Sequence, residues 1–378
     1  MQTPAGLHKK LKGKLELKPK IKVDKRNIKL LYTPGVADIV KIIAKDKECL
    51  YLYTGKGNNV AIVSDGSRIL GLGNLGAEAA LPVMESKALL YKIYGDVDAI
   101  SLCLKTQKAE EIISIVKNIS INFGAINIED IESPKCFEIV DELSKRLKIP
   151  VFHDDQHGTA VVVLAALLNA LKLVKKNLPN ARIIVLGAGA AGYGITKLLF
   201  YAGAKNMIVL DSVGSIYEGR DGLNDYKENL AKITNRKKED LGLESALHKS
   251  DVFIGVSGQK GILSRNMIKK MNRNAVVFAL SNPDPEIFPE EAKKGGAIIV
   301  ATGRSDFPNQ VNNALVFPSL MRKILDEKRK SISEKLLYQA AKDLAKAVTN
   351  PKLESIIPSF DFKRQKGTFF NYRHHKKF

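Results

Sequence analysis

The chain has 378 residues, of which 45% are hydrophobic and 26% charged, and it carries a formal net charge of +20. This length suits two domains, and this hydrophobic fraction excludes an intrinsically disordered chain. We find no apolar run long and charge-free enough to span a bilayer, and the N-terminus MQTPAGLHKKLKGK lacks the apolar segment of a signal peptide. Cys49, Cys103 and Cys136 are scattered and odd in number, so they predict neither a disulfide framework nor a zinc site. We therefore expect a soluble protein of the reducing cytoplasm with no membrane partner.

The positive charge has two explanations. Basic residues are dense in the segments 8–29 and 363–378, which is typical of nucleic-acid binding. Lysines are also spread along the whole chain beside apolar helix positions, as they are on solvated surfaces. We favour the solvated surface and expect no nucleic-acid partner.

Up to about Pro150, short apolar runs alternate with helical patterns. NVAIVSD, VDAISLCL and FGAINIED read as strands, while EEIISIVKNIS and CFEIVDELSKRL read as helices. This alternation predicts a small α/β domain over residues 1–150.

A second α/β unit is predicted over residues 151–378. Its strands are ARIIVL, KNMIVLD, DVFIGV, NAVVFAL and GAIIVAT, and SISEKLLYQAAKDLAKAV reads as an amphipathic helix that packs back on the first domain. Ligands of open α/β sheets bind at the carboxyl ends of the strands. The polar residues that follow these strands are Ser257, Ser281, Asn282 and Thr302.

A glycine-rich turn follows the strand ARIIVL and begins a helix. Its pattern, GxGxxG, favours a tight turn, close approach of a pyrophosphate and close packing of helix on strand. The free N–H groups of the helix N-terminus favour phosphate. The alternative is a glycine turn without a ligand, but Asp211 ends the next strand, where an acidic residue accepts a hydrogen bond from an adenosine ribose. The sequence therefore predicts a doubly wound, Rossmann-like NAD(P)-binding domain, whose cofactor turn contains Gly187, Gly189, Ala190, Ala191 and Gly192.

The same aspartate bears on which dinucleotide is bound. Asp211 would repel a 2′-phosphate, and the following SVGSIYEG offers no nearby cation. Arg220 could fold inward and weaken this argument. The sequence favours NAD over NADP.

Two acidic pairs follow predicted buried strands. Glu129 and Asp130 end FGAINIED, and Asp154 and Asp155 lie in VFHDDQHGTA. Either pair alone is more often a solvated turn or a helix cap. Two such pairs, each at the end of a buried strand, predict a shared divalent cation. Adjacent buried carboxylates repel each other unless a cation neutralises them. An oxygen-ligand site of this kind suits Mg²⁺ or Mn²⁺.

The two histidines beside the second pair suggest zinc as an alternative. His153 and His157 lie at a strand-to-helix turn rather than on one helix face. We therefore interpret them as local hydrogen-bond partners.

Eight segments, in order, resemble the short prokaryotic and archaeal malic enzymes. The resemblance covers about residues 8–346, and departures from the family pattern are Ser86, Ser319 and Arg68, the last of which leaves the partner of the substrate carboxylate open. The segments are YTPGVA, SDGSRILGLGNLG, ALPVMESKALL, FGAINIEDI, VFHDDQHGTA, GAGAAG, VFALSNPDPEIFPEEA and ATGRSDFPNQVNNALVFP.

The resemblance implies a role for each matching residue. Without the surrounding motifs, Lys87 would read as a surface lysine and Tyr32 as a packing tyrosine. Arg304 is a further candidate for the malate carboxylate, after Arg68. The implied roles are general acid for Tyr32, general base for Lys87, an orienting carboxylate for Asp154, metal ligation for Glu129, Asp130 and Asp155, and binding of substrate or nicotinamide for Arg68, Asn282 and Asn313.

The resemblance also implies a reaction and an assembly. The reaction is oxidative decarboxylation of (S)-malate to pyruvate and CO₂ with reduction of NAD(P)⁺, and the assembly is a homodimer. We expect the metal and partial burial to lower the pKa of Lys87, so that its amine can accept a proton. Two alternatives remain: an oxaloacetate decarboxylase or malolactic activity without net cofactor turnover, and a basic nucleic-acid-binding protein on an inactive scaffold.

Overall fold

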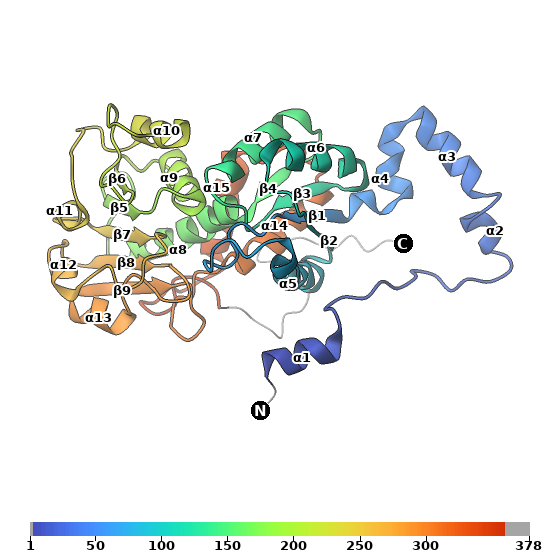
Figure 1. Ribbon diagram of the computed structural model, residues 1–378. Helices are drawn as coiled ribbons and strands as arrows, with labels where there is room; N and C mark the ends of the chain where they lie inside the picture. Colours follow the sequence, from blue (N-terminus) through green and yellow to red (C-terminus); the bar gives the residue numbers. More distant parts are fainter. Residues whose placement is uncertain (1–2, 360–378) are drawn as a thin grey trace.

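The computed structural model describes residues 3–359. Its first α/β unit contains a parallel four-stranded sheet in the order β2-β1-β3-β4 (Figure 1). Because β4 pairs with β3, this sheet continues past residue 150. The strands are β1 (Asn59–Ser64), β2 (Asp98–Cys103), β3 (Ala125–Ile128) and β4 (Val151–His153).

The second unit contains a parallel five-stranded sheet in the order β6-β5-β7-β8-β9. The chain winds in both directions from β5, so the carboxyl ends of β5 and β7 flank the crevice at which such sheets bind ligands. This arrangement confirms the predicted doubly wound α/β fold. The strands are β5 (Arg182–Leu186), β6 (Asn206–Leu210), β7 (Val252–Gly255), β8 (Ala275–Ala279) and β9 (Ala297–Thr302).

Helices surround both sheets, and parallel sheets are normally covered in this way on both faces. In the first unit these are α5 (Ala77–Gly95), α6 (Ala109–Ile119) and α7 (Lys135–Arg146). In the second unit they are α9 (Ala190–Tyr201), α10 (Asp225–Ile233), α11 (Leu243–Leu247), α12 (Arg265–Lys269) and α13 (Pro289–Lys294). Short helical turns lie at Ser120–Asn122, Asp154–Gly158 and Asn313–Leu315.

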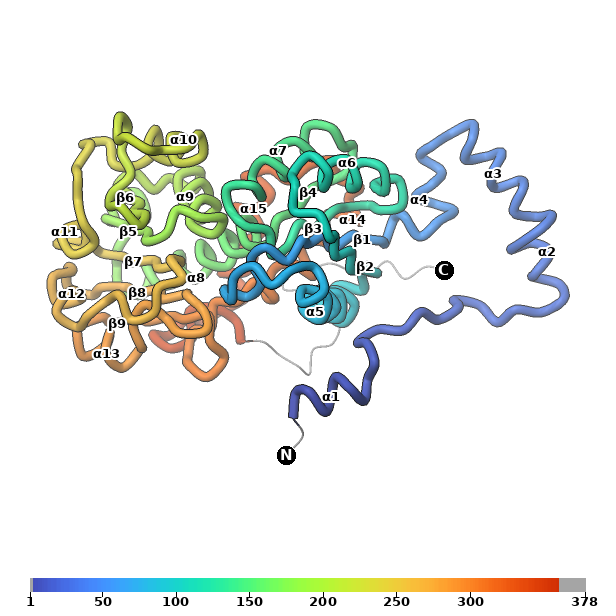
Figure 2. Tube along the Cα trace, in the orientation of Figure 1, coloured from blue at the N-terminus to red at the C-terminus, as the bar shows by residue number. Residues whose placement is uncertain are grey.

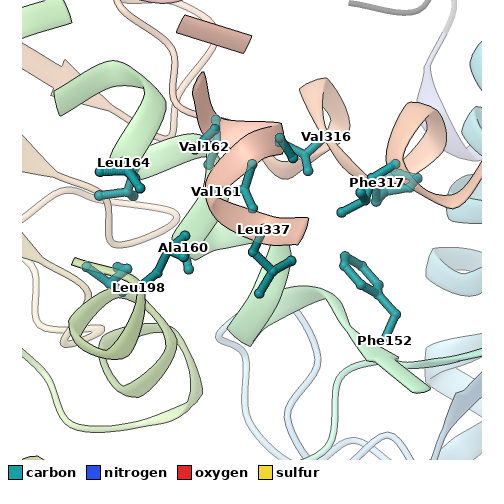
Figure 3. Close-up of a cluster of buried hydrophobic side chains, with 14 of the residues drawn as sticks. Phe152, Ala160, Val161, Val162, Leu164, Leu198, Val316, Phe317 and Leu337 are labelled. Carbon is teal, nitrogen blue, oxygen red and sulfur yellow. The ribbon is translucent and has the colours of Figure 1, made fainter. Parts of the chain in front are cut away.

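Helix α8 (Thr159–Leu173) lies between the two units and is buried along nearly its whole length. One hydrophobic core contains residues of both sheets and of α8, and a second core lies on the other face of the second sheet. Figure 3 shows α8 side chains packed among residues of β4, α9 and the C-terminal helices. The labelled residues are Phe152, Ala160, Val161, Val162, Leu164, Leu198, Val316, Phe317 and Leu337.

This burial explains one departure from the sequence-based expectation about membranes. Within residues 3–359, the helical stretch Asp154–Leu173 is long and apolar enough, by composition alone, to cross a bilayer. However, 72% of its apolar window is buried inside the protein. Packing between two sheets is a sufficient reason for its apolar character.

Two C-terminal helices return from the second unit. Helix α14 (Phe317–Asp326) packs on α5 of the first unit, as the ring contact between Phe317 and Tyr91 shows. Helix α15 (Glu334–Lys346) packs on α8 and α9, where the Asn169 amide donates hydrogen bonds to the carbonyls of Ala345 and Ile356. We expected the C-terminal amphipathic helix, which is α15, to pack on the first domain. Instead α14 packs on a helix of the first unit, and α15 packs on α8 and α9.

The N-terminal segment forms an extended arm, which we define as residues 3–55. Figures 1 and 2 show it projecting away from both units. No residue of the arm is buried, although many of its side chains are apolar. Lys14 connects the arm to the first unit by donating to the carbonyl of Pro82. The helices of the arm are α1 (Pro4–Leu11), α2 (Ile28–Leu31), α3 (Val36–Lys45) and α4 (Leu50–Tyr53), with a single turn at Lys47–Cys49. A further turn, Gly55–Gly57, leads from the arm to β1.

Candidate active site

A buried lysine joins the two acidic pairs. Lys87, on α5, is buried, and its Nζ lies 2.6 Å from Glu129 Oε1 and 2.5 Å from Asp154 Oδ2. Glu129 follows β3 and Asp154 follows β4, so the parallel pairing of these strands puts both carboxylates at one edge of the sheet. The Lys87 ammonium also lies 4.2 Å from the centroid of the Phe317 ring, a favourable cation–π contact.

Hydrogen bonds extend this cluster in both directions. On one side, Tyr91 donates to Asn127 Oδ1 (2.6 Å), and the Asn127 amide donates to Glu129 Oε2 (2.9 Å). On the other side, the Asn313 amide donates to Asp154 Oδ2 (3.2 Å). The structure therefore brings the predicted residues Lys87, Glu129, Asp154 and Asn313 into one network.

The sequence did not indicate Tyr91, Asn127 or Phe317 as members of this site. Tyr91 lies four residues after Lys87, hence on the same helix face, and this spacing was the one signal that could have identified it. Asn127 alternates with apolar residues of a fully buried strand, where a polar side chain needs a partner. Phe317 begins α14, which follows the last strand of the second unit. No local pattern links it to Lys87 on α5.

The charge state of Lys87 depends on the carboxylates around it. Burial on its own would lower the pKa of Lys87, but the carboxylates of Asp154 and Glu129 outweigh this effect and raise the pKa above its ordinary value. The expected lowering depends on a bound metal ion, and the side chains of the protein alone raise the pKa of Lys87 instead. A neutral Lys87 amine requires that another cation take over part of this negative charge.

The carboxylates around Lys87 still carry more negative charge than one lysine neutralises. Burial, followed by the charge of Asp155, raises the pKa of Asp130 to about 7. Burial also raises the pKa of Glu129, and the charge of Asp154 adds to this effect while Lys87 opposes it. One oxygen each of Asp130 and Asp154 is buried without a hydrogen-bond partner. Such groups fit the hard oxygen ligands that Mg²⁺ or Mn²⁺ requires.

The side chains do not have the arrangement of a formed metal site. Within residues 3–359, no group of three His, Cys, Asp or Glu side chains is placed to hold an ion. Glu129 turns to Lys87, and the Asp155 side chain is 39% exposed. The donor chemistry therefore suits a cation, while ligation by Glu129, Asp130 and Asp155 requires these side chains to reorient.

Of the two histidines, only His157 forms a ring hydrogen bond, because both ring nitrogens of His153 are buried without a hydrogen-bond partner. His157 Nδ1 accepts a hydrogen bond from the backbone N–H of His153 (3.1 Å). Burial lowers the pKa of His157 to about 3, so this ring is neutral at physiological pH. This geometry agrees with our interpretation of His157 as a hydrogen-bond partner.

The predicted cofactor turn lies between β5 and α9. Gly187 has φ +113° and lies against the Val256 backbone, and a Cβ on Gly192 would lie 1.7 Å from the Gly187 carbonyl oxygen. Neither position accepts a side chain without displacement of the backbone. Ala190 begins α9, and its N–H donates to Ser133 Oγ of the first unit (3.1 Å). A helix N-terminus is thus available to phosphate where the two units meet.

This geometry makes the glycine turn testable. Gly192→Ala should weaken NAD binding at least about tenfold, because the turn must open to admit the new methyl group. Isothermal calorimetry would measure the affinity. Gly203→Ala, at a glycine outside the turn whose added Cβ meets no atom within 4 Å, is the matched control and should bind NAD as wild type does. If Gly192→Ala bound NAD as wild type does, the role of this turn would be wrong.

A cavity of about 520 Å³ adjoins this turn. It is lined by Gly187, Gly189, Asp211 and Ser257, and also by Arg68, which comes from the first unit. The cavity therefore extends between the two units along the carboxyl ends of β5, β6 and β7, as expected of a dinucleotide site.

Asp211 is held by two cations that lie close to it. Arg220 donates from Nη1 to Oδ1 (3.0 Å) and from Nη2 to Oδ2 (2.5 Å), and Lys227 donates to Oδ2 (2.7 Å). Burial alone would raise the pKa of Asp211, but these bonds hold it well below its usual range. Arg220 does fold inward, and Lys227 is a second cation that the sequence had not indicated.

The remaining predicted residues lie apart from Lys87. Tyr32 is 68% exposed and lies on the arm, so the structure does not place it at the site of its own chain. Asn282 is exposed beside Gly303, and Arg304 forms a two-bond ion pair with Asp306. Arg68 lines the cavity, and its backbone N–H donates to the carbonyl of Asp130. Because it lines the cavity, Arg68 stays the stronger candidate for an anionic group.

Comparison with known proteins gives concordant matches. Residues 12–110 match the family described as malic enzyme, N-terminal domain, and residues 156–368 match malic enzyme, NAD binding domain. The chain is 47% identical to the bifunctional malic/malolactic enzyme of Bacillus subtilis, over 93% of this chain and 87% of that protein. It is 44% identical to the NADP-dependent malic enzyme of Halomonas elongata, over 93% of this chain and 83% of that protein. The crystal structure of NAD-dependent malic enzyme from Thermotoga maritima has a TM-score of 0.92 and 49% identity, covering 96% of this chain and 97% of that one.

Proposed function

Because the chain belongs to the malic enzyme family, we propose that it converts (S)-malate to pyruvate and CO₂ with reduction of NAD(P)⁺ and also decarboxylates oxaloacetate. The observation that carries this proposal is the buried Lys87, held between two carboxylates in a chain whose second unit has a dinucleotide-type glycine turn. A buried base with oriented partners is what abstraction of an alcohol proton requires.

Each residue of the cluster has a proposed task. Lys87 accepts the proton of the malate C2 hydroxyl, while Asp154 orients its amine. Glu129, Asp130 and Asp155 would hold Mg²⁺ or Mn²⁺, which when bound polarises the C2 oxygen and stabilises the enolate left by decarboxylation. Ligation by Glu129 would also withdraw one of the two charges that raise the pKa of Lys87. Arg68, Asn282 and Asn313 are the proposed substrate-side contacts.

We also propose that residues 1–150 supply most of the catalytic side chains and that residues 151–378 bind the cofactor. Gly187, Gly189, Ala190, Ala191 and Gly192 would bind the pyrophosphate. Asp211 at the end of β6 favours NAD as the preferred dinucleotide. The free cysteines are consistent with a cytoplasmic location.

Absorbance of the reduced nicotinamide tests the reaction. With malate, Mn²⁺ and NAD⁺, the signal should grow steadily. Formation of lactate without growth of this signal would support malolactic turnover instead, an alternative favoured by the 47% identity to a bifunctional malic/malolactic enzyme. A gel shift with nucleic acid tests the other alternative, a basic nucleic-acid-binding protein. The basic C-terminal segment 363–378, on which that alternative partly rests, lies outside the described residues.

The exposed arm supports a homodimer. Apolar side chains along it face solvent, including Leu17, Leu30, Val40 and Leu52, and such a surface is normally covered by a partner. We propose that the arm packs on a second copy of the chain and that Tyr32 acts as general acid in the partner's site. This assignment would explain why Tyr32 is remote from Lys87 of its own chain.

Mixed dimers distinguish action in the partner's site from action in the same chain. Lys87→Ala and Tyr32→Phe should each be inactive as pure proteins. Equal co-expression should restore about a quarter of wild-type activity, because half of the dimers are mixed and one of their two sites combines intact Lys87 with intact Tyr32. Absence of recovery in purified mixed dimers would contradict the proposal, as would a monomer in sedimentation analysis of the wild-type chain.

A further inference from the structure

Glu286 holds together the two segments that follow β7 and β8. It lies between β8 and α13, and it is fully buried. Its Oε1 accepts hydrogen bonds from the backbone N–H and the hydroxyl of Ser257 (both 3.2 Å) and from the hydroxyl of Ser281 (2.5 Å). Its Oε2 accepts from the backbone N–H of Ser281 (3.2 Å). Burial of a carboxylate is costly unless donors satisfy its oxygens, and here two serines supply four donors.

The backbone around Glu286 leaves room for its carboxylate. A Cβ on Gly255, the last residue of β7, would lie 2.4 Å from Glu286 Cδ, so a side chain at this position would displace the glutamate. The Gly258 N–H donates to Ser281 Oγ (2.8 Å), and the Leu263 N–H donates to the Glu286 carbonyl (3.0 Å). The segment after β7 is therefore fixed to the segment after β8 through Glu286 and Ser281.

These two segments lie where the nicotinamide end of a bound dinucleotide belongs. The sheet order places β6 on one side of β5 and places β7 and β8 on the other (Figure 1). With its adenosine ribose at β6 and its pyrophosphate at the glycine turn after β5, a dinucleotide extends toward β7 and β8. Ser257 lines the cavity there, and a Cβ on Gly71 of the first unit would lie 3.0 Å from the Asn282 carbonyl oxygen. This end of the crevice therefore faces the first unit, which contains Lys87.

We propose that Glu286 is a positioning residue for the nicotinamide ring, which it places by holding Ser257 and, through Ser281, the neighbouring Asn282. The inference rests on the dinucleotide site of the proposed function and extends it to a residue behind the wall of the cavity. Without this carboxylate, the buried N–H and O–H groups of both serines lose their acceptor and turn to other partners. Hydride transfer requires the ring at one position relative to the substrate, so a loosened wall slows it.

Two ligands that differ in the nicotinamide ring test this without turnover. Calorimetry on the full-length chain would compare NAD⁺ with adenosine diphosphate ribose, which lacks the ring. Glu286→Gln keeps the size of the side chain but places an amide donor opposite donors of the serines. It should weaken NAD⁺ binding about tenfold and change binding of adenosine diphosphate ribose less than about twofold. Glu290→Gln, at an exposed glutamate of α13, is the matched control and should change neither affinity.

Ser281→Ala is a second variant that tests the same connection if Glu286→Gln does not fold. It removes one donor to Glu286 and the acceptor of the Gly258 N–H, while the glutamate itself stays in place. NAD⁺ binding should weaken about threefold, again with little change for adenosine diphosphate ribose. Equal weakening of both ligands, or no weakening of NAD⁺ binding, would show that Glu286 does not position the ring.

The outcomes separate this inference from the proposed function. If the wild-type chain does not bind NAD⁺, the dinucleotide site of the proposed function is wrong. If it binds NAD⁺ and Glu286→Gln loses affinity for both ligands equally, the site stands and the role of Glu286 is wrong. Malate deuterated at C2 supplies a second measurement, since slower hydride transfer should give Glu286→Gln a larger isotope effect on kcat/KM than wild type. An unchanged isotope effect would contradict the inference.

Discussion

Replacing Lys87 with alanine is expected to lower kcat for malate oxidation at least about a hundredfold, the usual contribution of a positioned general base. Lys87 is the one basic group within 3 Å of both Glu129 and Asp154 among the described residues, so no neighbour can take over its proton transfer. NAD binding should remain, because the glycine turn and Asp211 lie on the second unit. Steady-state assays of nicotinamide reduction would measure kcat, and calorimetry would measure the affinity for NAD.

Lys92→Ala is the matched control for this change. Lys92 lies on the same helix, is partly exposed and pairs with Asp96 and Asp98 rather than with the active-site carboxylates. Its kcat should stay near that of wild type. Retention of more than a few per cent of wild-type turnover by Lys87→Ala would show that Lys87 is not the base.

Replacing Asp155 with alanine is expected to abolish activation by Mn²⁺. The remaining ligands would supply too few oxygens, and loss of one carboxylate from a divalent site typically removes most of the affinity. Because the Asp155 side chain is partly exposed, its removal should leave the fold intact. Removal of the Asp155 charge should also lower the pKa of Asp130, since that charge is the second cause, after burial, of its raised value of about 7.

Titration with Mn²⁺ followed by electron paramagnetic resonance would measure this loss directly. Asp326→Ala, which removes a partly exposed carboxylate paired with Arg322, is a suitable control and should bind Mn²⁺ as wild type does. Equal Mn²⁺ affinity in wild type and Asp155→Ala would rule out the proposed ligand set.

The sequence was sufficient to predict features that depend on local pattern. The turn from Gly187 to Gly192 is recognisable because steric exclusion of a Cβ leaves glycine at fixed spacings. The convergence of Glu129 and Asp154 follows from parallel strands, whose carboxyl ends share one edge. Both predictions rest on neighbours in sequence or on a general property of sheets.

Other features depend on contacts between distant segments and were not predictable. The charge of Lys87 is set by carboxylates 42 and 67 positions away, and only their actual approach decides whether burial or attraction prevails. Lys227 contacts Asp211 across 16 positions, from a separate helix. The position of Tyr32 depends on an arm that makes few contacts with the rest of its own chain.

The helix α8 has a further consequence for how proteins of this architecture can diversify. Domains that each contain an independent interior can be exchanged between genes as separate modules. Here one helix contributes apolar side chains to the packing of both halves. The dinucleotide-binding half therefore cannot be transplanted or replaced by recombination at residue 150 without exposing the apolar surface of its neighbour.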